Sequence, residues 1–159
     1  MIRTLTYAIM VIAAGPAFAL SCVRPSVEQS YRNADASPHD HSIAVGQLHL
    51  LAAPGPVTEG RPRGQGFQVP TGYTVPARFD GEFFDGNGFT LSRDVSVTVN
   101  VTCVSMWCGA AQDVDYGLFF FRIQNGNYVL DANACPGTVF DDAHPGMLSA
   151  VARCHHGGC

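Results

Sequence analysis

The most reactive side chains gather near the C-terminal end, where Cys154, His155, His156 and Cys159 lie close together in sequence. Thiolates and imidazoles are ligands that zinc and copper prefer in proteins. Structural zinc sites usually separate two ligand pairs by a longer stretch of chain, and cysteines in an oxidising compartment are more often disulfide-bonded. The segment therefore predicts a disulfide that closes a short loop, with a metal site built from these four residues as the alternative.

Other polar side chains could act as metal ligands or as acid and base catalysts. His39 and His41 flank Asp40 in a small, polar stretch, which predicts an exposed loop rather than a shared ligand position. The remaining carboxylates of interest are Asp113, Asp115, Asp131, Asp141 and Asp142. The first two lack the glycine and terminal glutamate of an EF-hand loop, and the last two are expected to cap the final helix.

The sequence contains none of the common catalytic motifs. It has no Gly-x-Ser-x-Gly and no His-Glu-x-x-His stretch, and without lysine it has no phosphate-binding loop of the usual kind. We therefore expect a protein that is not an enzyme and that uses no cofactor. The formal net charge is −4, and the nine basic residues are all arginine. The chain therefore lacks the excess of basic residues that is typical of nucleic-acid-binding proteins.

The aromatic side chains are expected to pack rather than to bind a ligand. Trp107 lies beside Cys108, which predicts packing against a disulfide, and Phe83, Phe84 and Phe89 are predicted core residues. Asn100 begins an Asn-x-Thr stretch, but it falls within a predicted strand of an apparently bacterial protein, so we interpret the sequon as chance.

The first 19 residues are typical of a secretory signal. Arg3 supplies the positive charge, residues 5–14 the apolar region, and the Ala-Phe-Ala stretch at 17–19 the cleavage site. This predicts a periplasmic or secreted protein with one domain over residues 20–159, and no later apolar stretch is long enough to cross a membrane. The alternative is a lipoprotein signal that places a lipid anchor on Cys22.

The hydrophobic pattern predicts a mostly β domain with a helix at either end. The predicted helices cover residues 25–33, which Pro25 opens, and a segment that Pro145 opens. The predicted strands cover residues 42–51, 73–79, 83–84, 95–103, 118–123 and 128–130, with a tight hairpin turn at 124–127. Gly46 is expected to mark a bulge, and residues 52–66, rich in proline and glycine, predict an exposed loop. Short strands that are separated by turn residues favour a small closed β-barrel over a flat sheet.

Several short motifs, in order along the chain, resemble netrin-type domains, the family that includes the tissue inhibitors of metalloproteinases. They are Ser-Cys-Val-Arg-Pro at 21–25, residues 29–34, Val45-Gly46, Trp-Cys-Gly at 107–109, Tyr-Gly-Leu-Phe-Phe at 116–120 and residues 130–135. The chain also resembles small secreted proteins of alphaproteobacteria that end in a Cys-x-x-Gly-Gly-type segment. The resemblance implies a five-stranded barrel of the oligosaccharide/oligonucleotide-binding (OB) type, stapled by disulfides.

The netrin-type resemblance also implies how the six cysteines pair. It pairs Cys22 with Cys135, leaving Cys103 with Cys108 and Cys154 with Cys159. The alternative joins Cys22 to Cys108 and Cys103 to Cys135. Metalloproteinase inhibitors of this family chelate zinc through a free N-terminal cysteine, whereas Leu20 and Ser21 precede Cys22 here, so that mechanism does not carry over.

These observations together predict a non-enzymatic binding or interaction module outside the cytoplasm. Its partner would be a protein or another component of the cell envelope. The alternatives are a periplasmic metal-binding protein that uses the C-terminal cysteines and histidines, and an envelope lipoprotein.

Overall fold

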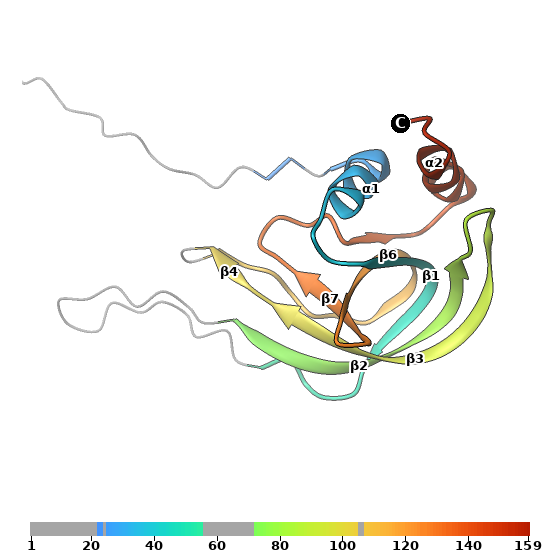
Figure 1. The fold of residues 1–159 in the computed structure, drawn as a ribbon. Coiled ribbons are helices and arrows are strands. Elements are labelled where there is room, and N and C mark those ends of the chain that lie inside the picture. The colour runs from blue at the N-terminus through green and yellow to red at the C-terminus, as the bar shows by residue number, and fades with distance from the viewer. Residues whose placement is uncertain (1–21, 24, 56–71, 105–106) are drawn as a thin grey trace, which may run out of the picture.

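The computed structural model describes residues 22, 23, 25–55, 72–104 and 107–159, and its helices and strands are shown in Figure 1. In chain order they are α1 (Val27–Asp35), β1 (His41–Leu50), β2 (Tyr73–Phe84), β3 (Phe89–Val101), β4 (Cys103–Val104), β5 (Trp107–Cys108), β6 (Val114–Gln124), β7 (Asn127–Ala132), β8 (Val139–Asp141) and α2 (Pro145–His155). A mostly β chain with a helix at either end is confirmed. The predicted signal at residues 1–19 and most of the predicted loop at 52–66 lie outside the described residues, while 52–55 belong to no helix or strand.

Six strands form the main sheet, in the order β1-β2-β3-β7-β6-β8. β1 pairs antiparallel with β2 along one edge and with β6 along the other. β3 and β7 pair in parallel, while β6 pairs antiparallel with β7 and with β8. The register of β1 against β6 shifts between Gly46 and Leu48, which confirms the bulge expected at this glycine.

β2 is longer than the sequence predicts. The expectation of two short strands at 73–79 and 83–84 is wrong, because one continuous strand runs through Asp80 and Gly81. Those two residues are typical of turns, but here Gly81 lies opposite Gly46 of β1. A Cβ on Gly81 would lie 2.3 Å from the Val45 carbonyl oxygen. Glycine is therefore required here because β1 and β2 lie close together, and not because the chain turns.

The hairpin turn between β6 and β7 is confirmed. Asn125 and Gly126 connect the two strands with φ values of 52° and 77°. Positive φ at both central residues is the geometry of a tight turn that suits the right-handed twist of paired strands.

Two apolar clusters lie on opposite sides of β6. Phe119 and Phe121 belong to the first cluster, where they pack edge-on against Phe79 of β2. Leu118 and Phe120 point the other way, toward the helices. β6 is therefore buried on both faces, which explains its unbroken run of apolar residues.

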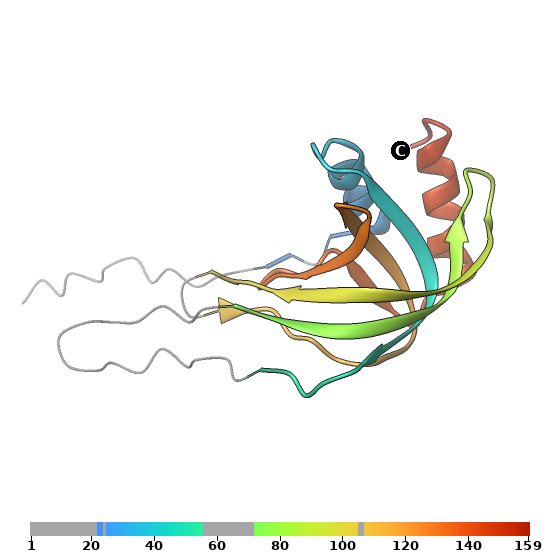
Figure 2. The same cartoon turned by 60° about the horizontal axis from the view of Figure 1, so that its bottom comes forward.

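The two helices pack side by side over the second cluster, as Figures 1 and 2 show, while β2 and β3 run along the opposite side. Val27 of α1 and Val151 of α2 are buried there, with Tyr31 packed against them. Val27 and Tyr31 thus share the predicted apolar face. The first-turn position predicted for Pro25 is wrong: Ser26 is the N-cap, its hydroxyl accepting a hydrogen bond from the Gln29 amide, and Pro25 precedes it.

Three disulfides tie the described chain together, and all six cysteines take part. They join Cys22 to Cys135, Cys103 to Cys108, and Cys154 to Cys159. These are the pairs that the netrin-type resemblance implied, and the alternative pairing is absent from the structure. Within the described residues, no helix is both long and apolar enough to cross a membrane.

Candidate functional site

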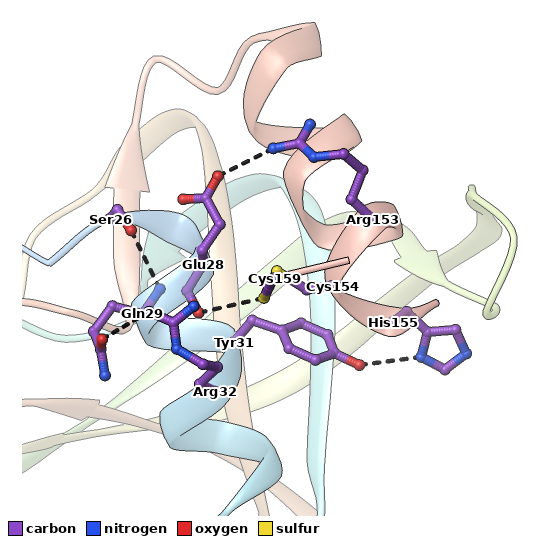
Figure 3. Close-up of a disulfide and its surroundings, with 9 residues drawn as sticks. All are labelled: Ser26, Glu28, Gln29, Tyr31, Arg32, Arg153, Cys154, His155 and Cys159. Atoms are coloured by element: carbon purple, nitrogen blue, oxygen red, sulfur yellow. Dashed lines mark hydrogen bonds and ion pairs between the residues drawn. A yellow bond between two sulfur atoms is a disulfide. The ribbon is translucent and has the colours of Figure 1, made fainter. Parts of the chain in front are cut away.

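The C-terminal cluster forms a joint between the two helices, as Figure 3 shows. Cys154 and Cys159 are bonded to each other, so neither offers the thiolate that binds metal. The Tyr31 hydroxyl lies 3.1 Å from Nδ1 of His155, whose ring also packs edge-on against Phe84. In the described part of the chain, no three His, Cys, Asp or Glu side chains are placed to share a metal ion.

An ion pair reinforces this joint. The Arg153 guanidinium on α2 lies 3.1 Å from the Glu28 carboxylate on α1. Hydrogen bonds from the backbone amide of Glu28 and from Ser26 lower the pKa of this carboxyl, and the charge of Arg153 lowers it further. The C-terminal segment that the sequence suggested as a metal site therefore helps to hold α1 and α2 together.

His39 and His41 do not converge on a shared ligand position. His39 lies in the exposed loop before β1, and His41 is the first residue of the strand. Nδ1 of His41 lies 2.9 Å from the His39 carbonyl oxygen, so this imidazole nitrogen contacts backbone. The Asp40 carbonyl oxygen accepts a hydrogen bond from the Ile123 amide at 2.8 Å, so the backbone of Asp40 helps to hold this loop against β6.

The predicted helix cap at Asp141 and Asp142 is wrong. The N-cap of α2 is His144, which makes no side-chain capping bond, and the first turn carries no acidic residue. Pro145 starts the helix, so Asp142 lies two residues too early to reach the free amides, and its own φ is 55°. Asp113 is structural as well, because its Oδ1 accepts a hydrogen bond from the Leu50 amide at 2.6 Å. Asp115 is exposed.

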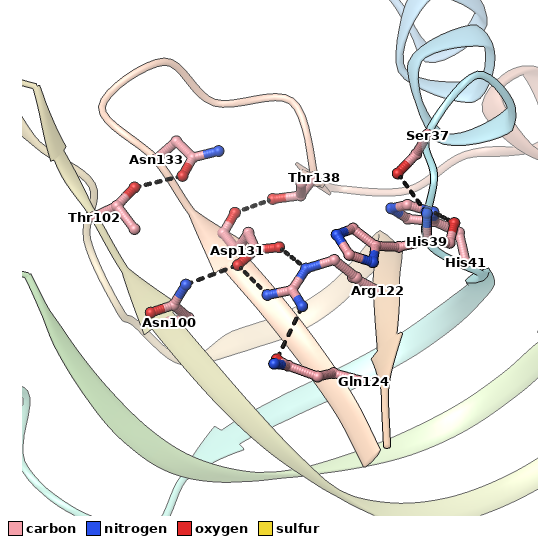
Figure 4. Close-up of polar contacts among 10 residues, drawn as sticks. All are labelled: Ser37, His39, His41, Asn100, Thr102, Arg122, Gln124, Asp131, Asn133 and Thr138. Carbon is pink, nitrogen blue, oxygen red and sulfur yellow. Dashed lines mark hydrogen bonds and ion pairs between the residues drawn. The ribbon is translucent and has the colours of Figure 1, made fainter. Parts of the chain in front are cut away.

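Asp131 of β7 forms the centre of a polar network across three strands, as Figure 4 shows. Its carboxylate accepts hydrogen bonds from Arg122 Nε at 2.6 Å and from Arg122 Nη2 at 2.9 Å. Asn100 of β3 donates a further bond at 2.8 Å, and Arg122 also donates to Gln124. The two charges are paired in the bidentate geometry that favours arginine over lysine.

Charge and burial oppose each other at this carboxylate. Burial raises the pKa of Asp131, but the hydrogen bonds from Arg122 and Asn100 and the charges of Arg122 and His41 lower it, with a net lowering. The hydrogen bond with Asp131 raises the pKa of Arg122. Both groups stay charged, and each neutralises the other.

One pocket, of about 370 Å³, is lined by residues of α1 and of the loop at 133–138. Another pocket has a volume of about 340 Å³. The smaller, which we call the strand-face pocket, lies over the outer face of β2, β3, β6 and β7. Its lining residues are Thr74, Thr98, Asn100, Arg122, Gln124, Asn125, Asn127 and Val129. Arg122 is the one charged side chain in this lining, and its charge is already paired. The strand-face pocket therefore offers amides and hydroxyls with no net charge.

Trp107, which we expected to pack against a disulfide, has a largely exposed side chain. Trp107 lies opposite Val104 in the β4–β5 pair, next to the Cys103–Cys108 bridge. Its side chain is 52% exposed and that of Val104 is 57% exposed. Phe83 is buried, and Phe84 and Phe89 pack together against the helix cluster, as predicted.

Comparison of the chain with protein-family models, with curated proteins and with solved structures gives no match.

Sequence reasoning named Asp131 and Asn100 but did not connect them. The alternation along residues 95–103 does place Asn100 on the wet face of its strand. Arg122, however, follows a run of apolar residues, and nothing in the neighbouring sequence indicates that it pairs with Asp131. The connection depends on the parallel pairing of Asn100 with Asp131, which joins residues distant in sequence.

Proposed function

We propose that the chain is an exported binding module built on a closed OB-like barrel of the netrin type. The ladder pairings support closure, because β1-β2-β3-β7-β6 returns to β1 through the β1–β6 pairing. Five strands in such a Greek-key arrangement are the frame of the OB fold. Fold alone does not name a ligand, so the surface chemistry must supply it.

The N-terminal disulfide favours release over lipid attachment. A sulfur atom that is bonded to another sulfur cannot also carry a thioether-linked lipid, and Cys22 is bonded to Cys135. Three disulfides among six cysteines suit an oxidising compartment outside the cytoplasm. We propose a soluble periplasmic or secreted protein, cleaved after Ala19. The intact mass of the exported protein tests this, since a lipid on Cys22 would add the mass of its acyl chains.

We propose that the strand-face pocket binds an uncharged glycan segment. The observation that carries the proposal is its lining of threonine, asparagine and glutamine around a neutralised arginine. Hydroxyls and amides both donate and accept hydrogen bonds, which suits the hydroxyl groups of a sugar. A nucleic acid would need unpaired basic side chains along its path, which this lining does not offer.

The test is an NMR titration of the exported, isotope-labelled chain with chitotetraose and cellotetraose, and with a single-stranded DNA of similar length. We expect one of the two glycans to bind with a Kd below about 1 mM and to shift the amides of Thr98, Asn100 and Asn125, with no shift from the DNA.

A pair of matched variants decides whether the strand-face pocket is responsible. Thr98→Leu replaces a lining hydroxyl with a bulkier apolar group and should abolish the shifts. Ser96→Leu makes a comparable change on the same face of β3, outside the pocket lining, and should leave them unchanged. Equal binding by both variants, or no glycan binding up to about 10 mM, would contradict the proposal.

A further inference from the structure

Asp141 is an exposed carboxylate at the end of β8 that forms no ion pair with any arginine or histidine among the described residues. Its partner in the ladder with β6 is Gly117, which has no side chain to offer it a hydrogen bond. Alternate residues of a strand share a face, so Asp141 lies on the same side of β8 as Val139. Val139 packs against the first apolar cluster, whereas Phe140 packs toward the helices. An unpaired negative charge therefore lies beside apolar side chains.

Asp141 and Val139 line a third pocket, which we call the Asp141 pocket. It has a volume of about 270 Å³ and lies between the segment at 108–112, the end of β7 and the loop at 133–138. Its larger apolar lining residues and the alanine of β7 are Leu48, Val99, Leu130, Ala132, Pro136 and Val139. A concave site with a mostly apolar lining and few polar groups is the usual form of a small-molecule site.

A ligand can reach the groups that would hold it in this pocket. Leu48, Val99 and Leu130 are almost fully buried and form its floor. Ala132 and Val139 are half-buried, and Pro136 and Asp141 are exposed, so these side chains face the open part of the space. Contact with them requires no movement of the core.

The walls of the Asp141 pocket are fixed by backbone contacts. The Gly109 amide donates a hydrogen bond to the Thr102 carbonyl oxygen at 3.0 Å, and a Cβ on Gly109 would collide with the Ala132 carbonyl oxygen. On the other wall, the Thr138 hydroxyl donates to the Asp131 carbonyl oxygen at 2.8 Å, as Figure 4 shows. A preformed pocket binds a ligand without first ordering its own walls.

The charge of the lining favours a cation. Asp141 is the only charged side chain among the lining residues that the structure describes, and Gln112, Asn133 and Thr138 add neutral polar groups. The Asn133 side-chain oxygen already accepts a hydrogen bond from Thr102. The whole chain has a net charge of −4 and no lysine. A positive group near Asp141 is therefore attracted, and a negative group is repelled.

We propose that the Asp141 pocket binds a small organic cation, namely a primary amine on a compact apolar body. The ammonium group pairs with the Asp141 carboxylate where the pocket opens to solvent, so neither charge has to lose all of its water. The apolar body packs against Ala132, Pro136 and Val139. This site is separate from the strand-face pocket, and neither proposal depends on the other.

The test compares benzylamine, benzyl alcohol and benzoate, which have nearly the same shape and differ in charge, in NMR titrations of the full exported chain. At about pH 7 the amine is positive, the alcohol neutral and the benzoate negative. We expect benzylamine to bind about 3- to 5-fold more tightly than benzyl alcohol, the factor that a partly exposed ion pair supplies, and benzoate to bind most weakly. The amides of Gly109, Ala132 and Asp141 should shift and that of Thr98 should not, which separates this site from the strand-face pocket.

Two variants and a matched control make the assignment. Asp141→Asn should bind benzylamine and benzyl alcohol alike. Asp142→Asn makes the same change of charge one residue further on, outside the described pocket lining and at a φ of 55° that asparagine tolerates, and should keep the preference. Ala132→Val adds two methyl groups on the face of β7 that lines the pocket and should weaken all three probes.

Each contrary result overturns the proposal. No binding of benzylamine by the parent chain up to about 10 mM, or equal binding of benzylamine and benzyl alcohol, would show that the carboxylate selects no cation. A preference that survives in Asp141→Asn would place the selecting charge elsewhere. Equal loss of the preference in Asp142→Asn would assign it to the overall acidity of the chain. Unchanged binding in a folded Ala132→Val chain would show that the apolar body lies outside this pocket.

Discussion

Asp131 shows how one side chain can join three strands on the outer face of the sheet. Its carboxylate is held by Arg122 of β6 and Asn100 of β3, and both members of the ion pair are largely shielded, with side-chain exposures of 17% and 22%. Asp131→Asn would leave the Arg122 guanidinium without its counter-charge. We expect a loss of about 1–3 kcal/mol in the free energy of unfolding, measured by urea denaturation.

The matched control for Asp131→Asn is Asp94→Asn. Asp94 pairs with Arg78 at 2.5 Å, but these side chains are 45% and 58% exposed. Exposed ion pairs are screened by water and salt, so this control should change the unfolding free energy by about 0.5 kcal/mol or less. Equal costs at the two sites would mean that shielding does not distinguish the pairs.

Asp85 gives a pH prediction at the tip between β2 and β3. Its carboxylate accepts hydrogen bonds from the Thr90 hydroxyl and from the Asn87 and Gly88 amides, which lower its pKa from 3.8 to about 2. Because the folded pKa lies below the unfolded one, the stabilisation is fully present above about pH 4 and is lost as the pH falls toward 2. Carboxyl-carbon NMR should follow this titration directly.

Thr90→Val is the control for the Asp85 titration. It removes the strongest of the three hydrogen bonds while keeping a β-branched residue in β3. The Asp85 midpoint should then move up toward the ordinary aspartate value near 4. A midpoint unchanged in Thr90→Val would show that the hydroxyl does not hold the carboxylate.

Among the elements, β1 and β2 depend on glycine where they face each other. Gly46 and Gly81 are opposite in the ladder, and a Cβ on Gly46 would lie 2.3 Å from the Asp80 carbonyl oxygen. Gly46→Ala must therefore push the strands apart. We expect a loss of about 1–3 kcal/mol or more in the free energy of unfolding, measured by chemical denaturation.

Gly88→Ala is the matched control for Gly46→Ala. Its Cβ would meet only the Thr90 methyl, at an ordinary 3.7 Å. This variant should change stability little, because nothing has to move. A large loss in both variants would point to glycine's backbone freedom rather than to strand contact as the cause.

The elements that could be predicted are those whose signals are local. The turn at Asn125 and Gly126 was predictable because adjacent residues dictate positive φ, and the alternation at 95–103 identified β3. The break expected between residues 79 and 83 is absent because Gly81 faces Gly46 of β1, and no local pattern indicates that contact. The cap predicted at Asp142 failed because Pro145 begins α2 later than a carboxylate cap would require.

For the whole molecule, the parts that could not be predicted are those that depend on distant pairing. The parallel ladder of β3 and β7 brings Asn100 to Asp131, and no local pattern encodes that register. Likewise, Ser30 follows the helical pattern of α1 without any sign that its hydroxyl ends up buried and unpartnered. The strand-face pocket also arises from contacts between segments that are distant in sequence, since its lining runs from Thr74 to Val129.

The disulfides act on this whole-molecule scale, and their loop lengths rank them. Cys22–Cys135 spans 113 residues, whereas Cys103–Cys108 spans 5. In the chain-entropy account, the long bridge restricts the unfolded chain far more, so it stabilises by about 4–5 kcal/mol against about 2 kcal/mol for the short one. Replacing both cysteines of each pair with serine, and measuring unfolding without reductant, should reproduce that order. Equal losses would mean that the long bridge does not act through the unfolded chain, and α1 and the loop at 133–138 would then owe their placement to packing alone.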